Sequence, residues 1–286
     1  MRHWQLNETN FIGGVKSPQP VSSISPRTNK MRHAAQPGAK AFCCGVSHLF
    51  IRGEGTKIIK RYYDSNRKSK DIKKMNEYYK ILGKILYSGK MQSNRKGNVK
   101  YLLNEQLVLR PADLLDIFEG HSIARKKLKN ELQLFMQGER CVEKYREAGI
   151  NWWDYCGAIL VNSYPSYFEK LPPLIAKINR EKRNSKNYVL HLGATGVESN
   201  QAPCLSLVQF QIDESELVIS AYQRSSDANL GLPADIYHLY LMSRQIELPL
   251  KSITLNLGNV HIYENNIEKT RSLISGEETV KFDLNV

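Results

Sequence analysis

Cys204 and Arg224 are the two residues whose types and spacing could support nucleophilic chemistry. Each lies at one end of a segment in which apolar and polar residues alternate, and a short acidic stretch joins the segments into a predicted β-hairpin. If Glu214 and Ser215 are the two loop residues, Cys204 lies opposite Ser225 and diagonal to Arg224. A guanidinium beside a thiol stabilises the thiolate and can bind an anionic substrate. A buried structural cysteine and a surface arginine would give the same pattern, and the spacing alone favours that interpretation.

Four short motifs around this hairpin resemble those of thymidylate synthases and occur in the order found in that family. They are Gln201-Ala202-Pro203-Cys204, Tyr222-Gln223-Arg224-Ser225-Ser226-Asp227, Leu230-Gly231-Leu232-Pro233 and Gly258-Asn259-Val260-His261-Ile262-Tyr263. Upstream, residues 131–138 and Trp152-Trp153-Asp154 resemble the family's glutamate-bearing helix and its tryptophan. The resemblance covers residues 75–286. It implies an enzyme that adds a one-carbon unit to a pyrimidine nucleoside monophosphate, with 5,10-methylenetetrahydrofolate as the carbon donor.

The resemblance also implies roles for residues around the nucleotide. Cys204 would attack position 6 of the pyrimidine ring, as a nucleophile that forms a covalent adduct. Arg224, Ser225 and Arg95 would bind the phosphate, since Arg95 falls where the family has its first phosphate-binding arginine.

Five further residues would surround the sugar, the base and the folate. His261 and Tyr263 are two positions apart on a predicted strand, so both face the same side and would bind the sugar hydroxyl. Glu131 would organise water and proton transfer near the base, and Asp227 would line the base and the folate. Trp153 would contact the folate.

Asp235 stands where thymidylate synthases have the asparagine that binds uracil. An amide matches uracil, whereas a carboxyl accepts from the exocyclic amine of cytosine and can share a proton with the neighbouring ring nitrogen. The related deoxycytidylate and cytidylate hydroxymethylases carry Asp at this place, so the resemblance predicts 5-hydroxymethylation of CMP or dCMP. The alternative for Asp235 is a helix N-cap, because Pro233 is typical of a helix start.

Several departures from the family weaken the case for ordinary thymidylate synthesis. Leu205 follows the nucleophile where the family usually has His, Asn259 replaces an Asp, and no Gly-Pro-Val-Tyr-Gly stretch follows Cys156. A poorer folate surface favours quenching by water over hydride transfer from the folate. Lys186 and Asn187 are a weak match to the arginines that the partner subunit supplies, and they predict a homodimer with shared phosphate sites. Thymidylate synthesis, and a catalytically weak homologue that binds nucleotide or RNA, are the alternatives.

The elements that must position these residues follow from hydrophobic periodicity. Helices are predicted at 76–88, from an N-cap at Ser122 to about 137, just before Gly149, at 233–245 and at 267–274. Strands are predicted at 187–193, 204–212, 217–224 and 252–263. This order predicts an α+β fold in which helices flank a central mixed or antiparallel sheet.

Charge and composition separate a leader from the predicted catalytic domain. Residues 1–74 hold 15 Lys and Arg against 4 Asp and Glu, a net of +11, which leaves 26 against 24, or +2, for residues 75–286. The leader is expected to be irregular and dispensable, with a transit peptide as the alternative, and nucleic-acid binding is expected only through it. The five cysteines show no metal-binding spacing and no segment is apolar enough to span a membrane, so a cytoplasmic protein without metal is expected.

Overall fold

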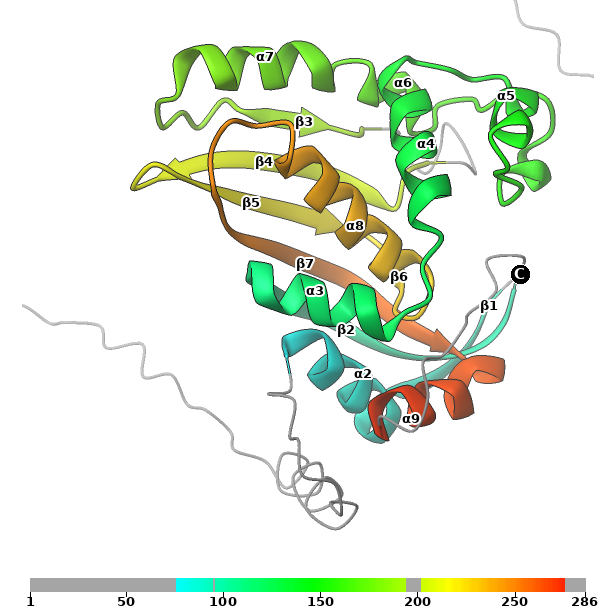
Figure 1. The fold of residues 1–286 in the computed structure, drawn as a ribbon. Coiled ribbons are helices and arrows are strands. Elements are labelled where there is room, and N and C mark those ends of the chain that lie inside the picture. The colour runs from blue at the N-terminus through cyan, green and yellow to red at the C-terminus, as the bar shows by residue number, and fades with distance from the viewer. Residues whose placement is uncertain (1–75, 95, 194–201, 276–286) are drawn as a thin grey trace, which may run out of the picture. The chain divides into compact units, whose positions relative to one another are not determined.

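The computed structural model describes residues 76–94, 96–193 and 202–275, and within them it confirms the α+β fold class (Figure 1). The predicted leader lies outside these residues, and so does Arg95. The helices of the described residues are α2 (Glu77–Ser88), α3 (Pro111–Gly120), α4 (Arg125–Met136), α5 (Val142–Glu147), α6 (Pro165–Phe168), α7 (Leu171–Glu181), α8 (Gly231–Ser243) and α9 (Ile267–Ser275). None of the helices within these ranges is long and apolar enough to cross a lipid bilayer.

A single mixed sheet of seven strands runs through the described residues. Its strands are β1 (Lys90–Asn94), β2 (Gly97–Leu109), β3 (Val189–His191), β4 (Leu205–Asp213), β5 (Glu216–Gln223), β6 (Ser226–Asp227) and β7 (Leu250–Tyr263). The spatial order is β1-β2-β7-β5-β4-β3, and β6 pairs with the far end of β7. The pairs of β7 with β5 and β6 are parallel, and the other pairs are antiparallel. The long strand β7 therefore connects both halves of the sheet.

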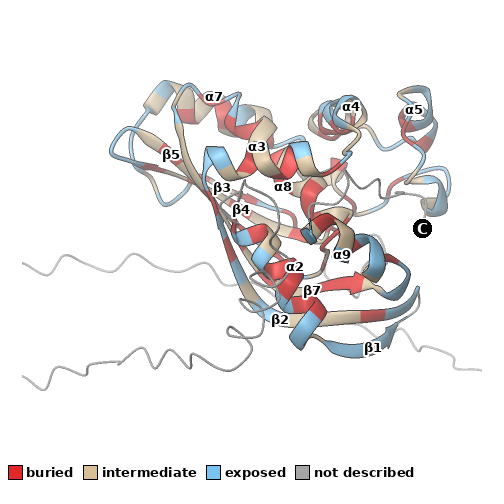
Figure 2. Cartoon of the chain, turned by 60° about the horizontal axis from the view of Figure 1, so that its bottom comes forward, coloured by how far each residue is buried: buried red, intermediate tan, exposed pale blue. Residues whose placement is uncertain are grey.

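One face of the sheet carries the hydrophobic core. Leu109, Ile253, Ile219 and Phe210 lie side by side across four strands, each paired with the next, and all are buried. Alternation of side chains along each strand keeps this row on one face. Helix α8 packs against this face, with α3 and α4 beside it (Figure 1), and Figure 2 shows buried positions on the helices as well as on the strands.

The predicted elements agree with the structure where periodicity was strong. Helices α2, α5, α8 and α9 and strands β3, β4, β5 and β7 were predicted, with ends that differ by a few residues. Strands β1 and β2 and helices α3 and α7 were not predicted.

The predicted N-cap at Ser122 is wrong. Helix α4 begins at Arg125, and residues 121–124 form a turn in which the N–H of Ile123 donates to the carbonyl of His121. The His121 ring is held by Tyr78, whose hydroxyl lies 2.7 Å from Nε2. This buried contact holds the chain at the end of α3, so the helix starts two residues later than the local sequence suggests. The predicted helix end at Gly138 is confirmed by its left-handed φ of 69°.

Candidate functional site

The hairpin that carries Cys204 and Arg224 has the predicted turn. Glu214 and Ser215 are its loop residues, with φ of 51° and 66°. The predicted pairing holds from Asp213 back to Leu207, but a bulge then shifts the register by one residue. The N–H of Arg224 donates to the carbonyl of Cys204 at 2.9 Å, so the two residues lie directly opposite each other. The predicted diagonal placement is therefore corrected, and the bulge brings thiol and guanidinium onto neighbouring positions.

The hydroxyl of Tyr164 accepts hydrogen bonds from the backbone at the nucleophile. The N–H of Cys204 donates to it at 3.1 Å and the N–H of Leu205 at 3.2 Å. Burial raises the pKa of Tyr164 well above its ordinary value, with a further rise from the nearby charges of Asp235 and Cys204, so the phenol stays protonated. The sequence motifs did not identify Tyr164 as a site residue. It lies between Ser163 and Pro165 and has no glycine beside it, unlike the tyrosine of the Gly-Pro-Val-Tyr-Gly stretch.

The thiol of Cys204 is not acidified overall, contrary to the expectation from Arg224. Burial raises its pKa, Arg224 lowers it, Asp235 raises it and Lys96 lowers it, and the sum is a rise. Desolvation therefore outweighs the guanidinium in the ligand-free protein. Cys204 must lose a proton as it attacks.

We expect Tyr164→Phe to lower the free energy of unfolding by about 1–3 kcal/mol, because it leaves two backbone N–H groups without their acceptor. Urea denaturation at neutral pH measures this change. Tyr240→Phe is the matched control, since Tyr240 is another half-buried tyrosine and its hydroxyl makes no hydrogen bond in the described part of the chain. Equal effects of the two substitutions would show that the hydroxyl of Tyr164 does not hold the nucleophile segment.

The guanidinium of Arg224 wraps around the chain that precedes the nucleophile. Its Nε donates to the carbonyl of Pro203 at 3.1 Å and its Nη2 to that of Ala202 at 2.8 Å. These two bonds fix the group and leave three of its five N–H bonds for an anion. Ser225 follows directly between β5 and β6. The neighbour of Arg95, Lys96, lies over the Tyr155 ring at 5.3 Å.

Glu131 on α4 is buried and heavily hydrogen-bonded. The indole N–H groups of Trp152 and Trp153 both donate to its Oε1 at 2.6 Å. Burial raises the pKa of Glu131 to about 7, although the two indole bonds lower it. A carboxyl with a pKa near neutrality can both accept and release a proton. This environment rules out the solvent-exposed helix position that sequence pattern alone would favour.

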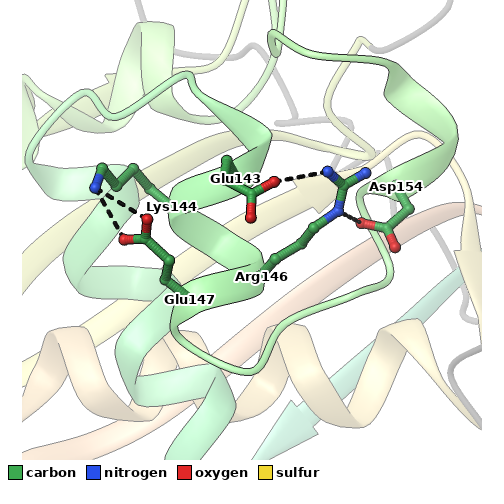
Figure 3. Close-up of polar contacts among 5 residues, drawn as sticks. All are labelled: Glu143, Lys144, Arg146, Glu147 and Asp154. Carbon is green, nitrogen blue, oxygen red and sulfur yellow. Dashed lines mark hydrogen bonds and ion pairs between the residues drawn. The ribbon is translucent and has the colours of Figure 1, made fainter.

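Exposed ion pairs lie along α5, and one of them links this helix to the tryptophan segment (Figure 3). Arg146 contacts Asp154 at 2.9 Å and Glu143 at 2.8 Å, and Lys144 contacts Glu147 at 2.9 Å. Exposed pairs of this kind contribute little to stability. Arg146 nevertheless links α5 to the residue that directly follows Trp153, which helps to align the indoles with Glu131.

Asp235 does not cap α8. The helix begins at Gly231, and Asp235 lies in its second turn, where its Oδ2 accepts from Nε2 of Gln223 on β5. The Oε1 of Gln223 is buried and has no hydrogen-bond partner among the residues that the structure describes. Burial and then the charge of Glu131 raise the pKa of Asp235, the hydrogen bond from Gln223 lowers it, and the net pKa is about 7. Asp235 and Glu131 are therefore two coupled carboxyls that titrate near neutral pH.

Strand β7 brings His261 next to Asp227. The two residues are partners in the parallel pairing of β6 with β7, and the rings of His261 and Tyr263 lie on one face with centroids 5.4 Å apart. Burial lowers the pKa of His261 to about 4, so the ring is neutral. Its Nδ1 lies 3.0 Å from Oδ1 of Asn259, which fixes the Nδ1–H tautomer and leaves Nε2 as an acceptor. Asn259 thus supplies the acceptor that the family's aspartate would supply.

Asp227 itself faces the start of α8. Its Oδ1 accepts from the N–H of Asn229 at 2.9 Å and of Leu230 at 3.4 Å. Burial raises the pKa of Asp227 to about 6 against the lowering effect of these bonds. Gly258 permits the approach of β7 to this region, because a Cβ there would lie 3.0 Å from the carbonyl of Arg224.

Lys186 lies apart from these residues. Its side chain is exposed and its carbonyl accepts from Gln209, farther along β4 than the nucleophile. Among the described residues, direct contacts or electrostatic interactions link six of the predicted site residues: Cys204, Arg224, Asp227, Asp235, Glu131 and His261. The structure adds five residues that the sequence did not predict for the site: Tyr164, Trp152, Gln223, His238 and Lys96.

Cys204 lies opposite Arg224 and within electrostatic reach of the buried carboxyl of Asp235, an arrangement suited to nucleophilic chemistry on an anionic substrate. The family model for thymidylate synthase matches residues 76–286, and the chain belongs to the thymidylate synthase family. At the level of this family the protein is a pyrimidine one-carbon transferase, and the family uses methylenetetrahydrofolate as its co-substrate.

Proposed function

We propose that this protein is a 5-hydroxymethyltransferase that acts on CMP or dCMP with 5,10-methylenetetrahydrofolate as carbon donor. The observation that carries this proposal is Asp235, a carboxyl inside α8 that is positioned by Gln223 and has a pKa of about 7. Such a carboxyl can accept with one oxygen and donate with the other. The exocyclic amine and the ring nitrogen of cytosine offer the matching donor and acceptor.

The proposed reaction begins at Cys204, whose thiol loses its proton as the sulfur bonds to ring position 6. The electron pair that develops at position 5 bonds to the donor's methylene carbon, and one of the two bonds from that carbon to the folate nitrogens breaks. The proton at position 5 then leaves to a base, the second bond from the methylene carbon to a folate nitrogen breaks, and tetrahydrofolate departs. Water then adds its hydroxyl to the exocyclic methylene, and the returning electron pair expels Cys204 as thiolate. Glu131, with its pKa near 7, is the group proposed to carry the protons.

The nucleotide and the folate have candidate contacts around Cys204. Arg224, Ser225 and Arg95 would bind the phosphate. Nε2 of His261, which has no hydrogen-bond partner among the described residues, would bind the sugar together with Tyr263. Trp153 stacks on Tyr155 with ring centroids 6.5 Å apart, and Tyr155 is exposed, so this pair offers a flat aromatic surface to the folate.

A homodimer is proposed through the face of the sheet opposite the core. On this face Val108 and Tyr222 are 43% and 44% exposed, which suits a partner surface better than solvent. Lys186, which does not reach the site of its own chain, would then be available to the phosphate site of the partner subunit.

Incubation with CMP, dCMP, UMP and dUMP, each with methylenetetrahydrofolate, tests the function. We expect one cytosine nucleotide to gain the mass of one CH2O unit and tetrahydrofolate to accumulate. A methyl product from dUMP together with dihydrofolate would identify a thymidylate synthase instead. Binding of the nucleotides without any product would identify a catalytically weak homologue.

A further inference from the structure

His238 lies on α8 with its imidazole against the carboxyl of Glu131. Both side chains are buried, with 6% and 4% of their surfaces exposed. The Nε2 of His238 is 3.0 Å from the carbonyl oxygen of Leu128 and 3.3 Å from Oε2 of Glu131. The Phe135 ring packs edge to face on the imidazole, with centroids 6.1 Å apart. The histidine is therefore fixed within the core beside a proposed acid–base group.

The tautomer of His238 follows from its neighbours. A backbone carbonyl can only accept, so Nε2 carries the hydrogen that the Leu128 carbonyl receives. Burial lowers the pKa of His238 to about 4, so the ring is neutral around pH 7. A neutral ring with a hydrogen on Nε2 cannot accept a proton from Glu131 at that nitrogen.

The two oxygens of Glu131 consequently differ. Oε1 accepts both indole N–H groups at 2.6 Å, so a proton on the carboxyl belongs on Oε2. Oε2 faces the N–H edge of His238 on one side. The proton on Oε2 must therefore point away from the imidazole, and the partial positive charge of that edge favours the ionised carboxylate.

We infer that His238 is a positioning residue that directs the exchangeable proton of Glu131 away from the core and stabilises the carboxylate once the proton has left. Its role in turnover rests on the proposed function, in which Glu131 carries the protons. The other groups around Glu131 are Asp235 on α8, Tyr145 on α5, the two indoles, and Lys127 over the Trp152 ring. Of these groups, Asp235 also has a pKa of about 7, so the experiment must show that a titration seen near pH 7 belongs to Glu131.

Tryptophan fluorescence gives a test that needs no substrate. Appearance of a charge on Glu131 beside both indole N–H groups should change the emission of Trp152 and Trp153. We expect the full-length protein to show a midpoint near pH 7 that Glu131→Gln abolishes, which separates the charge on Glu131 from that on Asp235 and from any emission change of Trp4. A titration that Glu131→Gln leaves unchanged would overturn the inference.

His238→Leu removes the N–H and should raise this midpoint by about one pH unit, since a hydrogen bond to a charged group is worth about that much. His238→Gln keeps an N–H at the place of Nε2 and should restore the original midpoint, even if His238→Leu were to fold poorly. Met242→Leu, a buried change one turn farther along α8, is the control for packing alone. An unchanged or lowered midpoint in His238→Leu, or a shifted one in His238→Gln, would contradict the inference. Turnover assays would separately decide the proposed function.

Discussion

Cys204→Ala is expected to reduce turnover by roughly four or more orders of magnitude, because no covalent adduct can form at ring position 6. The same variant should lose release of tritium from position 5 of the pyrimidine, since that exchange requires the adduct. Nucleotide binding should survive, because Arg224 is held by the carbonyls of Ala202 and Pro203 and not by the thiol.

Two measurements check this expectation. Tritium release from the labelled nucleotide reports the adduct, and equilibrium binding of the nucleotide shows that the site is intact. Cys141→Ala is the matched control, since Cys141 is an exposed free cysteine on the edge of α5 and should tolerate the change. Near wild-type exchange in Cys204→Ala would eliminate the covalent mechanism and leave the cysteine as a packing residue.

Much of the fold was accessible from the sequence because its signals were local. Alternation along β4 and β5 and the two-residue turn at Glu214 and Ser215 fix the hairpin within a few residues of chain. Helix α3 is harder to find. Pro111 opens it and Asp113 accepts from the N–H of Arg110 at 2.8 Å, but its short apolar stripe is easily read as a continuation of the preceding segment.

The long strand β2 is the largest element that was missed. Its burial does not alternate regularly, since one part of it is exposed beyond the core, and its pairing with β7 joins residues more than 140 positions apart. Local pattern carries no information on such a partner. The bulge beside Cys204 was missed for a related reason, because a shift of one residue depends on the fit of the strands in three dimensions.

Some residues of the candidate site could be predicted from the sequence, and others became apparent only from the structure. Residues carried by family motifs, such as Cys204 and Arg224, could be named from sequence. Tyr164 and His238 could not, because a tyrosine and a histidine on helix-like segments are ordinary core residues until packing shows what they touch. The sign of the shift in the pKa of Cys204 also required the structure, since burial and the guanidinium act in opposite directions.

Asp235→Asn is expected to lower activity on cytosine nucleotides and to raise it on uracil nucleotides, by about tenfold or more in each direction. Nε2 of Gln223 donates to one carboxyl oxygen of Asp235, so the new amide is expected to keep its oxygen at that place and to put its N–H₂ where the other oxygen accepted from the cytosine amine. A mispaired buried polar group costs about 1–3 kcal/mol. With uracil the amide offers both a donor and an acceptor in the required order. Asp213→Asn, at an exposed turn of the same sheet, serves as the control for the loss of a carboxylate.

Product analysis of the native protein and of Asp235→Asn in oxygen-18 water completes this test. Because water is proposed to quench the exocyclic methylene, the native protein should place the label in a hydroxymethyl group on the cytosine nucleotide and leave tetrahydrofolate unoxidised. The preference of Asp235→Asn for uracil should appear without a change in the fate of the folate, since the substitution alters the base contact and not the access of water to the methylene. An unlabelled methyl group on the uracil nucleotide and dihydrofolate from the native protein would show that Asp235 does not select cytosine, and that its bond to Gln223 serves to join α8 to β5.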